Sequence, residues 1–410
     1  QLTAKDPLHW TSRYQRWNLQ CAECHSTFVQ KGYDPATDTY RTTYAELNVA
    51  CEACHGPGSR HVAWVKGGRQ GDVGLVPLRA GRAWRFPSEE ARFAEPTRPA
   101  PAAAHDVCAP CHARRSPLLE APPAGQPLEA THRPALLEPP DFHPDGQQRG
   151  EVFTWASFQQ SRMFARGVTC IDCHEPHSLA LRAEGNALCT GCHAAAAFDG
   201  PEHHHHEVGG AGAQCVECHM PATRYMRVDP RRDHAFKLPR PDLSAELGTP
   251  DACTGCHLGR DAKWAAKAMD GWYGDGWRRR PTFARALHQG ALRGAAARSA
   301  LLGLAADVQQ PAVVRASALR LARGAVPLTA LPRFLADPTP LVRAEALDAL
   351  RALPPEAREA LARPLLGDPV RGVRVAAARA LGEATSEYEA ALELTADWPA
   401  GAVERGDLEA

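Results

Sequence analysis

The strongest constraint on this chain of 410 residues is a Cys-x-x-Cys-His motif that occurs seven times. The copies use all fourteen cysteines and leave none for a disulfide, a zinc site or a free thiol nucleophile. In order they are Cys21-Cys24-His25, Cys51-Cys54-His55, Cys108-Cys111-His112, Cys170-Cys173-His174, Cys189-Cys192-His193, Cys215-Cys218-His219 and Cys253-Cys256-His257. An isolated Cys-x-x-Cys also fits zinc or redox chemistry, but seven copies that all end in histidine favour haem attachment.

Haem chemistry explains the spacing of each motif. Cysteines at positions i and i+3 lie on one face of a helical turn, where both sulfurs reach the same porphyrin edge as thioethers. The histidine that follows then lies beneath the ring and ligates the iron. The sequence therefore predicts seven covalently bound haems c.

Twelve histidines outside the motifs are enough to give each of seven irons a second histidine ligand. His177 follows a motif histidine across a proline, which directs its ring toward a neighbouring haem. His61 follows a Gly-Pro-Gly turn, and His234 lies in a loop between two motifs. The histidine run at residues 203–206 is typical either of a surface metal site or, as we favour here, of one axial ligand. The candidate second ligands are His9, His61, His132, His143, His177, His204, His206 and His234.

The net charge, the lack of long apolar stretches and the haem chemistry limit which partners and which cellular location we expect. Lys plus Arg and Asp plus Glu both number 47, so the apoprotein is formally neutral and nucleic acid or an anionic membrane is not the expected partner. No stretch of 18 apolar residues predicts a transmembrane helix. Haem attachment of this type requires export, so we expect a periplasmic or extracellular protein whose numbering starts on a processed or trimmed chain.

Residues 1–258 carry all seven motifs, with little polypeptide for each haem. We expect a loop-rich domain in which porphyrins replace the usual side-chain core and short helices form at each motif. The proline-rich residues 95–145 fit a disordered linker or, as we prefer, an ordered wrap around haems, because two candidate ligands lie within them. Residues 151–166 predict one helix.

The composition changes after residue 258, where cysteine gives way to alanine, leucine and arginine. Val-Arg pairs at Val314, Val342 and Val373 recur after 28 and then 31 residues, each followed by small and apolar residues at helical spacing. This period predicts a HEAT-like helical solenoid over residues 259–384, with a plain amphipathic bundle as the alternative. Residues 385–410 resemble the start of a tetratricopeptide-like helix pair. The expected fold class is mainly α.

Several segments resemble bacterial multihaem c-type cytochromes that join a haem domain to HEAT or tetratricopeptide repeats. They are Asp6-Pro7-Leu8-His9-Trp10, Arg13-Tyr14-Gln15-Arg16-Trp17-Asn18, Cys51-Glu52-Ala53-Cys54-His55-Gly56-Pro57-Gly58-Ser59, Cys215-Val216-Glu217-Cys218-His219-Met220-Pro221, and Pro241-Asp242-Leu243 with Leu247-Gly248-Thr249-Pro250. The haem part is similar to cytochromes of nitrogen metabolism, including nitrite and hydroxylamine oxidoreductases.

The resemblance implies axial ligand roles for His61, His143, His177, His234 and one member of the run at 203–206. It also implies a further motif upstream and further repeats downstream, so we expect this chain to be a fragment, a processed form or the ordered part of a longer protein.

Three functions fit these observations. The leading one is electron transfer between redox proteins that act as donor and acceptor. The second is a multihaem oxidoreductase acting on a small nitrogen or sulfur species. Such reductases commonly carry lysine in place of the histidine in the motif of the active haem, whereas all seven motifs here end in histidine. The third is a homo-oligomer or extracellular filament in which histidines ligate haems of the next subunit.

Overall fold

The computed structural model describes residues 3–6, 9–12, 15–79, 81–225, 229–292 and 297–398. The chain forms two compact units, one from residues 1–78, 101–134 and 335–410, and the other from residues 79–100 and 135–334. Each unit combines motif-bearing segments with helices that follow residue 258. The sequence-based domain boundaries at residues 258 and 384 stay a prediction.

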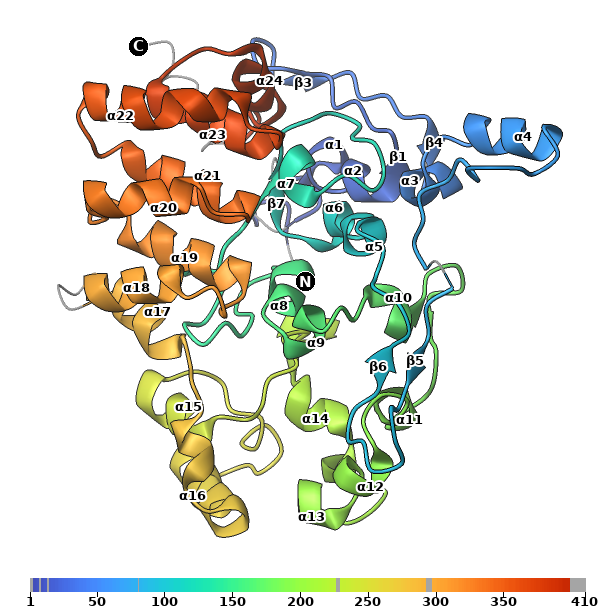
Figure 1. The fold of residues 1–410 in the computed structure, drawn as a ribbon, viewed down its shortest axis with the longest axis vertical. Coiled ribbons are helices and arrows are strands. Elements are labelled where there is room, and N and C mark those ends of the chain that lie inside the picture. Colours follow the sequence, from blue (N-terminus) through green and yellow to red (C-terminus); the bar gives the residue numbers. More distant parts are fainter. Residues whose placement is uncertain are drawn as a thin grey trace. The chain divides into compact units, whose positions relative to one another are not determined.

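The first unit contains short helices around its motifs and a group of longer helices near the C-terminus (Figure 1). Its elements are α1 (Trp17–Gln20), α2 (Ala22–His25), β1 (Ser26–Thr27), β2 (Tyr33–Asp34), β3 (Thr39–Tyr40), β4 (Glu46–Leu47), α3 (Cys51–His55), α4 (Ser59–Lys66), α5 (Ala103–Asp106), α6 (Ala109–His112), β7 (Arg115–Pro117), α7 (Leu128–Thr131), β8 (His132–Pro134), α21 (Pro340–Leu350), α22 (Pro355–Ala362), η5 (Arg363–Gly367), α23 (Arg371–Leu381) and α24 (Ser386–Leu394).

The second unit follows the same plan. Its elements are β5 (Trp84–Arg85), β6 (Glu95–Pro96), α8 (Trp155–Gln159), α9 (Arg162–Ala165), α10 (Cys170–Cys173), β9 (His174–Glu175), β10 (Ala180–Leu181), α11 (Ala187–Thr190), α12 (Ala195–Phe198), α13 (Pro201–His204), η2 (Ala211–Ala213), α14 (Cys215–His219), β11 (Ala222–Tyr225), β12 (Asp229–Arg232), α15 (Pro241–Leu247), α16 (Ala262–Tyr273), η3 (Gly276–Arg279), α17 (Ala284–Ala291), α18 (Ala297–Ala306), α19 (Ala312–Ala322), η4 (Leu328–Ala330) and α20, which ends at the boundary (Leu331–Leu335).

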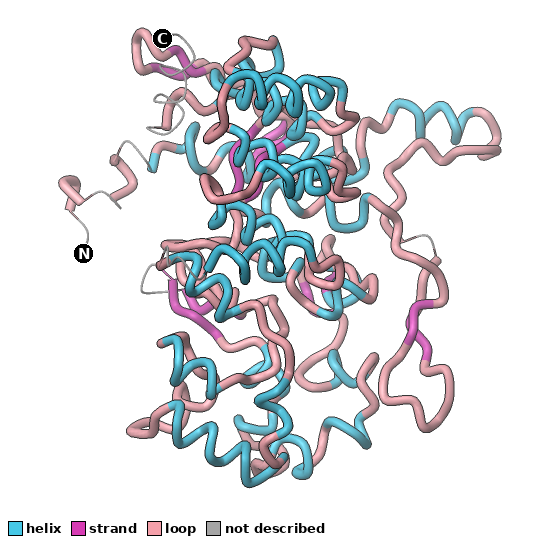
Figure 2. Tube along the Cα trace, turned by 60° about the vertical axis from the view of Figure 1, so that its left-hand side comes forward, coloured by secondary structure: helices cyan, strands magenta, loops and turns pink. Residues whose placement is uncertain are grey.

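Strands are short and never build a large sheet within the described residues. Figure 2 shows them as brief magenta segments between helices and loops. They form six two-stranded antiparallel sheets, of which β11–β12 is the longest, with Ala222 opposite Arg232 and Tyr225 opposite Asp229. The described residues are mainly helical with small sheets, which confirms the predicted mainly α class.

Short helices form at most motifs, as expected. Helices α2, α3, α6, α10 and α14 each contain two or more residues of a motif. At the fifth motif, α11 contains only Cys189, and the seventh motif lies in turns. One helical turn is enough to bring two cysteines three residues apart onto one face.

The single helix predicted for residues 151–166 is wrong in its extent, because the structure divides it into α8 and α9. Ser161 adopts an extended conformation between them, and its side chain accepts a hydrogen bond from the Phe164 amide at 3.0 Å. Serine competes well for such a capping position and therefore ends one helix and begins the next.

The Val-Arg pairs all lie on helices with a buried valine. Val314 on α19, Val342 on α21 and Val373 on α23 are fully buried. Arg343 donates to the Asp337 carbonyl at 2.8 Å, and Arg374 donates to the Asp368 carbonyl at 2.7 Å, in each case six residues back. Equivalent residues thus fix the loop before equivalent helices. This is consistent with a repeat, and the assignment to HEAT repeats stays a prediction.

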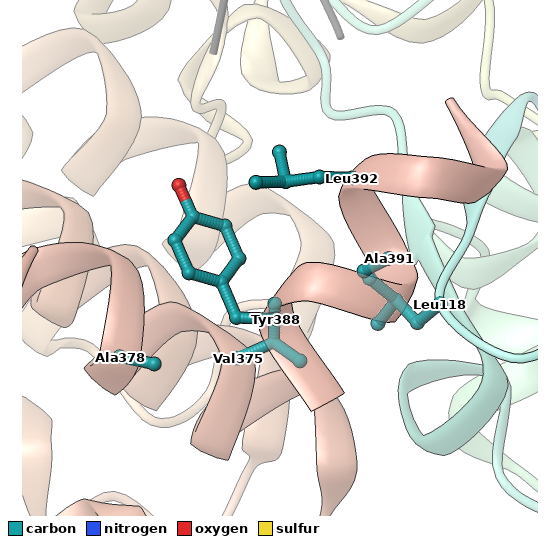
Figure 3. Packing of buried hydrophobic residues seen from close by; sticks show 6 residues of the cluster. All are labelled: Leu118, Val375, Ala378, Tyr388, Ala391 and Leu392. Atoms are coloured by element: carbon teal, nitrogen blue, oxygen red, sulfur yellow. The ribbon is translucent and has the colours of Figure 1, made fainter. Parts of the chain in front are cut away.

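The C-terminal helices of the first unit close over a small apolar cluster. It consists of Leu118, Val375, Ala378, Tyr388, Ala391 and Leu392 (Figure 3). Leu118 comes from the proline-rich segment, which therefore packs as ordered chain rather than as a linker. Helix α24 coincides with the first helix of the expected tetratricopeptide-like pair, and residues 399–410 of that expectation lie outside the described residues.

None of the helices in the described part of the chain combines the length and apolarity needed to span a bilayer.

Candidate haem-binding site

None of the fourteen motif cysteines forms a disulfide, and most are half-buried. In the first unit, the first and third motifs touch. The Cys24 sulfur lies 3.9 Å from the Cys111 carbonyl oxygen.

Arg115 holds these two motifs together. Its Nη1 donates to the Glu23 carboxylate of the first motif at 2.5 Å, and its Nε donates to the Pro110 carbonyl of the third at 2.7 Å. The side chain of Arg115 is only 10 % exposed. A buried guanidinium needs such partners because an unpaired buried charge is costly.

In the second unit, hydrogen bonds link the fifth motif to segments that also bind its neighbours. The Ala94 amide donates to the Cys192 carbonyl at 2.8 Å, and Arg82 of the same segment donates to Asp172 of the fourth motif. Asn186, three residues before Cys189, accepts a hydrogen bond from the Cys215 amide at 3.0 Å.

Three motif histidines face a second histidine across a similar distance. The ring centroids are 6.4 Å apart for His174 and His234, 6.1 Å for His219 and His203, and 6.0 Å for His257 and His206. The interplanar angles are 25°, 14° and 40°. Two imidazoles that bind one metal atom through bonds of about 2 Å place their ring centroids about 6 Å apart. The three pairs therefore fit a six-coordinate haem iron.

Two of these rings, and the ring of His61, are oriented so that Nε2 is available to bind a metal. The Nδ1 atoms of His61, His219 and His234 lie 3.0, 2.9 and 3.0 Å from the carbonyl oxygens of Val73, Lys237 and Arg232. A carbonyl only accepts, so each Nδ1 donates, and Nε2 of the neutral ring keeps the lone pair that binds a metal.

Comparison with known proteins adds two family matches. The model described as cytochrome c554 and c-prime matches residues 4–56, which contain the first two motifs. The model described as a doubled CXXCH motif matches residues 163–198, which contain the fourth and fifth motifs. The chain is a multihaem c-type cytochrome. No curated protein matches it.

One solved structure resembles the cytochrome over most of its length. The outer cell wall cytochrome OcwA shares 16 % identity at a TM-score of 0.41, and the alignment covers 96 % of this chain and 76 % of that one.

The run at residues 203–206 differs in detail from expectation. We expected His204 and His206 as candidate ligands, and His206 does face a motif histidine. The other facing member is His203, whereas the Nδ1 of His204 accepts a hydrogen bond from the His206 amide at 3.2 Å. His203 was not among the candidates, because four adjacent histidines carry no signal that separates one from another, and the ligand role of each member stays a prediction.

The remaining candidate ligands of the cytochrome have varied surroundings. His177 is exposed, with Nδ1 3.2 Å from a Glu175 carboxylate oxygen. His143 lines a largely apolar cavity of about 420 Å³ in the second unit. His132 is buried in β8, and its Nδ1 lies 2.8 Å from the Thr131 hydroxyl, while His9 lies beside Trp10. Their axial roles, and that of His61, stay predictions.

The fourth motif contains a buried ion pair. Arg82 donates to Asp172 at 2.6 Å and to the carbonyls of Gly167 and Arg98 at 2.6 and 3.1 Å. Burial by itself would raise the pKa of Asp172, but hydrogen bonds from the Thr169 amide and from Arg82 outweigh it and lower the pKa. The planar guanidinium thus satisfies three acceptors that a lysine ammonium cannot reach together.

We expect Arg82→Lys to lower the free energy of unfolding by about 1–3 kcal/mol, because at least one buried acceptor loses its donor. Urea unfolding followed by circular dichroism measures the change. Arg285→Lys is the matched control, because Arg285 also binds a carboxylate with two nitrogens but is about half exposed. Equal losses in both variants would show that the buried geometry has no special role.

Proposed function

We propose that the cytochrome is an electron carrier with seven covalently attached haems c, most of them ligated by two histidines. The observation that supports this most strongly is the set of three facing histidine pairs, each beginning at a motif histidine. A six-coordinate iron has no open position for a substrate, so its chemistry is the gain and loss of one electron. The structure thus favours electron transfer over catalysis at these three motifs.

The chain's own residues would hold and tune each haem. The two cysteines of a motif would fix the porphyrin edge, and the motif histidine would supply the first axial ligand. For the fourth haem we propose His234 as the second ligand. Carbonyl groups that accept from Nδ1 fix the ring orientation and increase ligand basicity, which lowers the reduction potential. The bound haem supplies the one-electron redox couple.

We expect His234→Ala to convert one haem of seven from low spin to high spin, because the fourth iron loses its second ligand. Electron paramagnetic resonance of the oxidised protein would show the new high-spin signal, and mass spectrometry would give the haem count. His288→Ala serves as the control, because it removes a histidine that lines the cavity of the same unit. Seven low-spin haems in the His234→Ala protein would contradict this ligand assignment.

We further propose that the cytochrome is exported and meets its redox partners outside the cytoplasm. Thioether attachment of haem is the basis for the location, because the chemistry takes place after export. The helices after residue 258 would form a HEAT-like surface for docking or assembly, which is supported by the matching positions of Arg343 and Arg374, each of which bonds the loop before its helix. Fractionation of cells that produce the full chain, with haem staining, tests the location.

A further inference from the structure

The histidine run at residues 203–206 lies against two different motifs. Within it, His203 faces His219 of the sixth motif, and His206 faces His257 of the seventh. Helix α13 ends at His204, and His205 adopts a left-handed conformation with φ of 56°. A left-handed residue turns the chain sharply, so histidines only three positions apart can approach separate partners.

The end of helix α16 holds the middle of this run. The His205 ring stacks on Trp272 with a centroid distance of 4.3 Å and an interplanar angle of 12°. The neighbouring Tyr273 hydroxyl donates to the His203 carbonyl at 2.5 Å. Trp272 therefore fixes the side chain of His205, and Tyr273 fixes the backbone at His203, so that α16 holds the run at two points.

Further contacts orient the two outer histidines. The His206 Nδ1 bonds with the His204 carbonyl, which leaves Nε2 as the metal-binding nitrogen. A Cβ atom at Gly212 would overlap the His206 ring, so glycine at this position leaves the space that the ring occupies. Phe198 packs edge-on against His203 with centroids 5.4 Å apart. The run is thus held at His203, His205 and His206.

We propose that this single run supplies the second axial ligands of both the sixth and the seventh haem, and that Trp272 and Tyr273 are positioning residues for both. The proposal rests on the function proposed above and deepens it. Because the two ligands belong to one short segment held by one helix end, a displacement at α16 reaches both irons together. The environments of these two haems are therefore coupled through the protein chain as well as through space.

Ligand substitution tests the first half of the proposal. His203→Gly and His206→Gly should each produce one high-spin haem of seven, and the double variant should produce two. His204→Gly is the control within the same run and should keep all haems low spin. Added imidazole should restore the low-spin signal in each single variant, which separates ligand loss from misfolding.

Substitution at α16 tests the second half. Trp272→Ala and Tyr273→Phe should shift the electron paramagnetic resonance g-values of two haems, the same two that respond to His203→Gly and His206→Gly. The haem that responds to His234→Ala should be unchanged, and Trp272→Phe should restore the stacking and the signal.

The outcomes separate this proposal from the proposed function. Loss of only one low-spin haem in the double variant, or a new high-spin haem in His204→Gly, would overturn the bridging role while leaving seven haems in place. A change at one haem alone after Trp272→Ala would overturn the positioning role. A wild-type protein without seven bound haems would instead overturn the proposed function itself.

Discussion

Replacing Lys31 by methionine should lower the free energy of unfolding by about 3–5 kcal/mol, because it leaves a buried carboxylate without its counter-charge. The Lys31 Nζ lies 2.9 Å from the Asp397 carboxylate, and the two side chains are 7 % and 1 % exposed. The same Nζ donates to the Leu394 carbonyl at 2.9 Å, and the Tyr40 hydroxyl donates to Asp397 at 3.1 Å. Burial and the neighbouring Asp397 raise the pKa of Tyr40, so this hydroxyl stays a donor.

Two further variants make this prediction specific. Lys31→Met combined with Asp397→Leu should recover much of the lost stability, because no uncompensated charge then remains buried. Arg60→Met, which breaks the exposed pair with Asp72 in the same unit, should change stability little. Guanidinium unfolding of the four proteins gives the comparison. A double variant as unstable as Lys31→Met would show that packing rather than charge determines the loss.

The sites of haem attachment could be predicted from the sequence because covalent chemistry fixes the spacing of the cysteines and the histidine in each motif. Cysteines three residues apart, followed at once by histidine, need only one turn of helix, and the structure has such a turn at most motifs. The two family models that match residues 4–56 and 163–198 agree with the prediction of haem attachment at these motifs. Local chemistry of this kind does not depend on the rest of the fold.

The histidines that lie opposite a motif histidine were harder to predict because their positions depend on long-range contacts. His234, a candidate from its loop position, does lie opposite a motif histidine, whereas His203 was not among the candidates, since only the turn at His205 and the stacking on Trp272 decide which members of the run face a motif. The break at Ser161 was missed for a related reason. A serine inside a helical pattern is tolerated or becomes a cap according to the tertiary path of the chain.

Acid should weaken the first unit through His132, by an amount that approaches about 5 kcal/mol near pH 3, taking 1.36 kcal/mol for each pKa unit. Burial is the main cause, and the nearby charge of Arg115 adds to it. Together they lower the pKa of His132 from 6.5 to about 3. Between these two values the unfolded chain binds a proton that the folded protein does not. Stability therefore falls as the pH drops below 6.5, and this contribution is absent above it.

His132→Gln removes this titration, so it should flatten the loss of stability between pH 6.5 and 4.5 relative to the wild type. Denaturant unfolding at pH 7.5 gives the internal reference, because His132 is neutral in both states there and any difference then reflects packing and the bond to Thr131. Equal pH slopes in the two proteins would contradict a buried neutral imidazole. A new high-spin haem in His132→Gln would instead make His132 an iron ligand, because loss of an uncoordinated histidine cannot change the spin state of a distant iron.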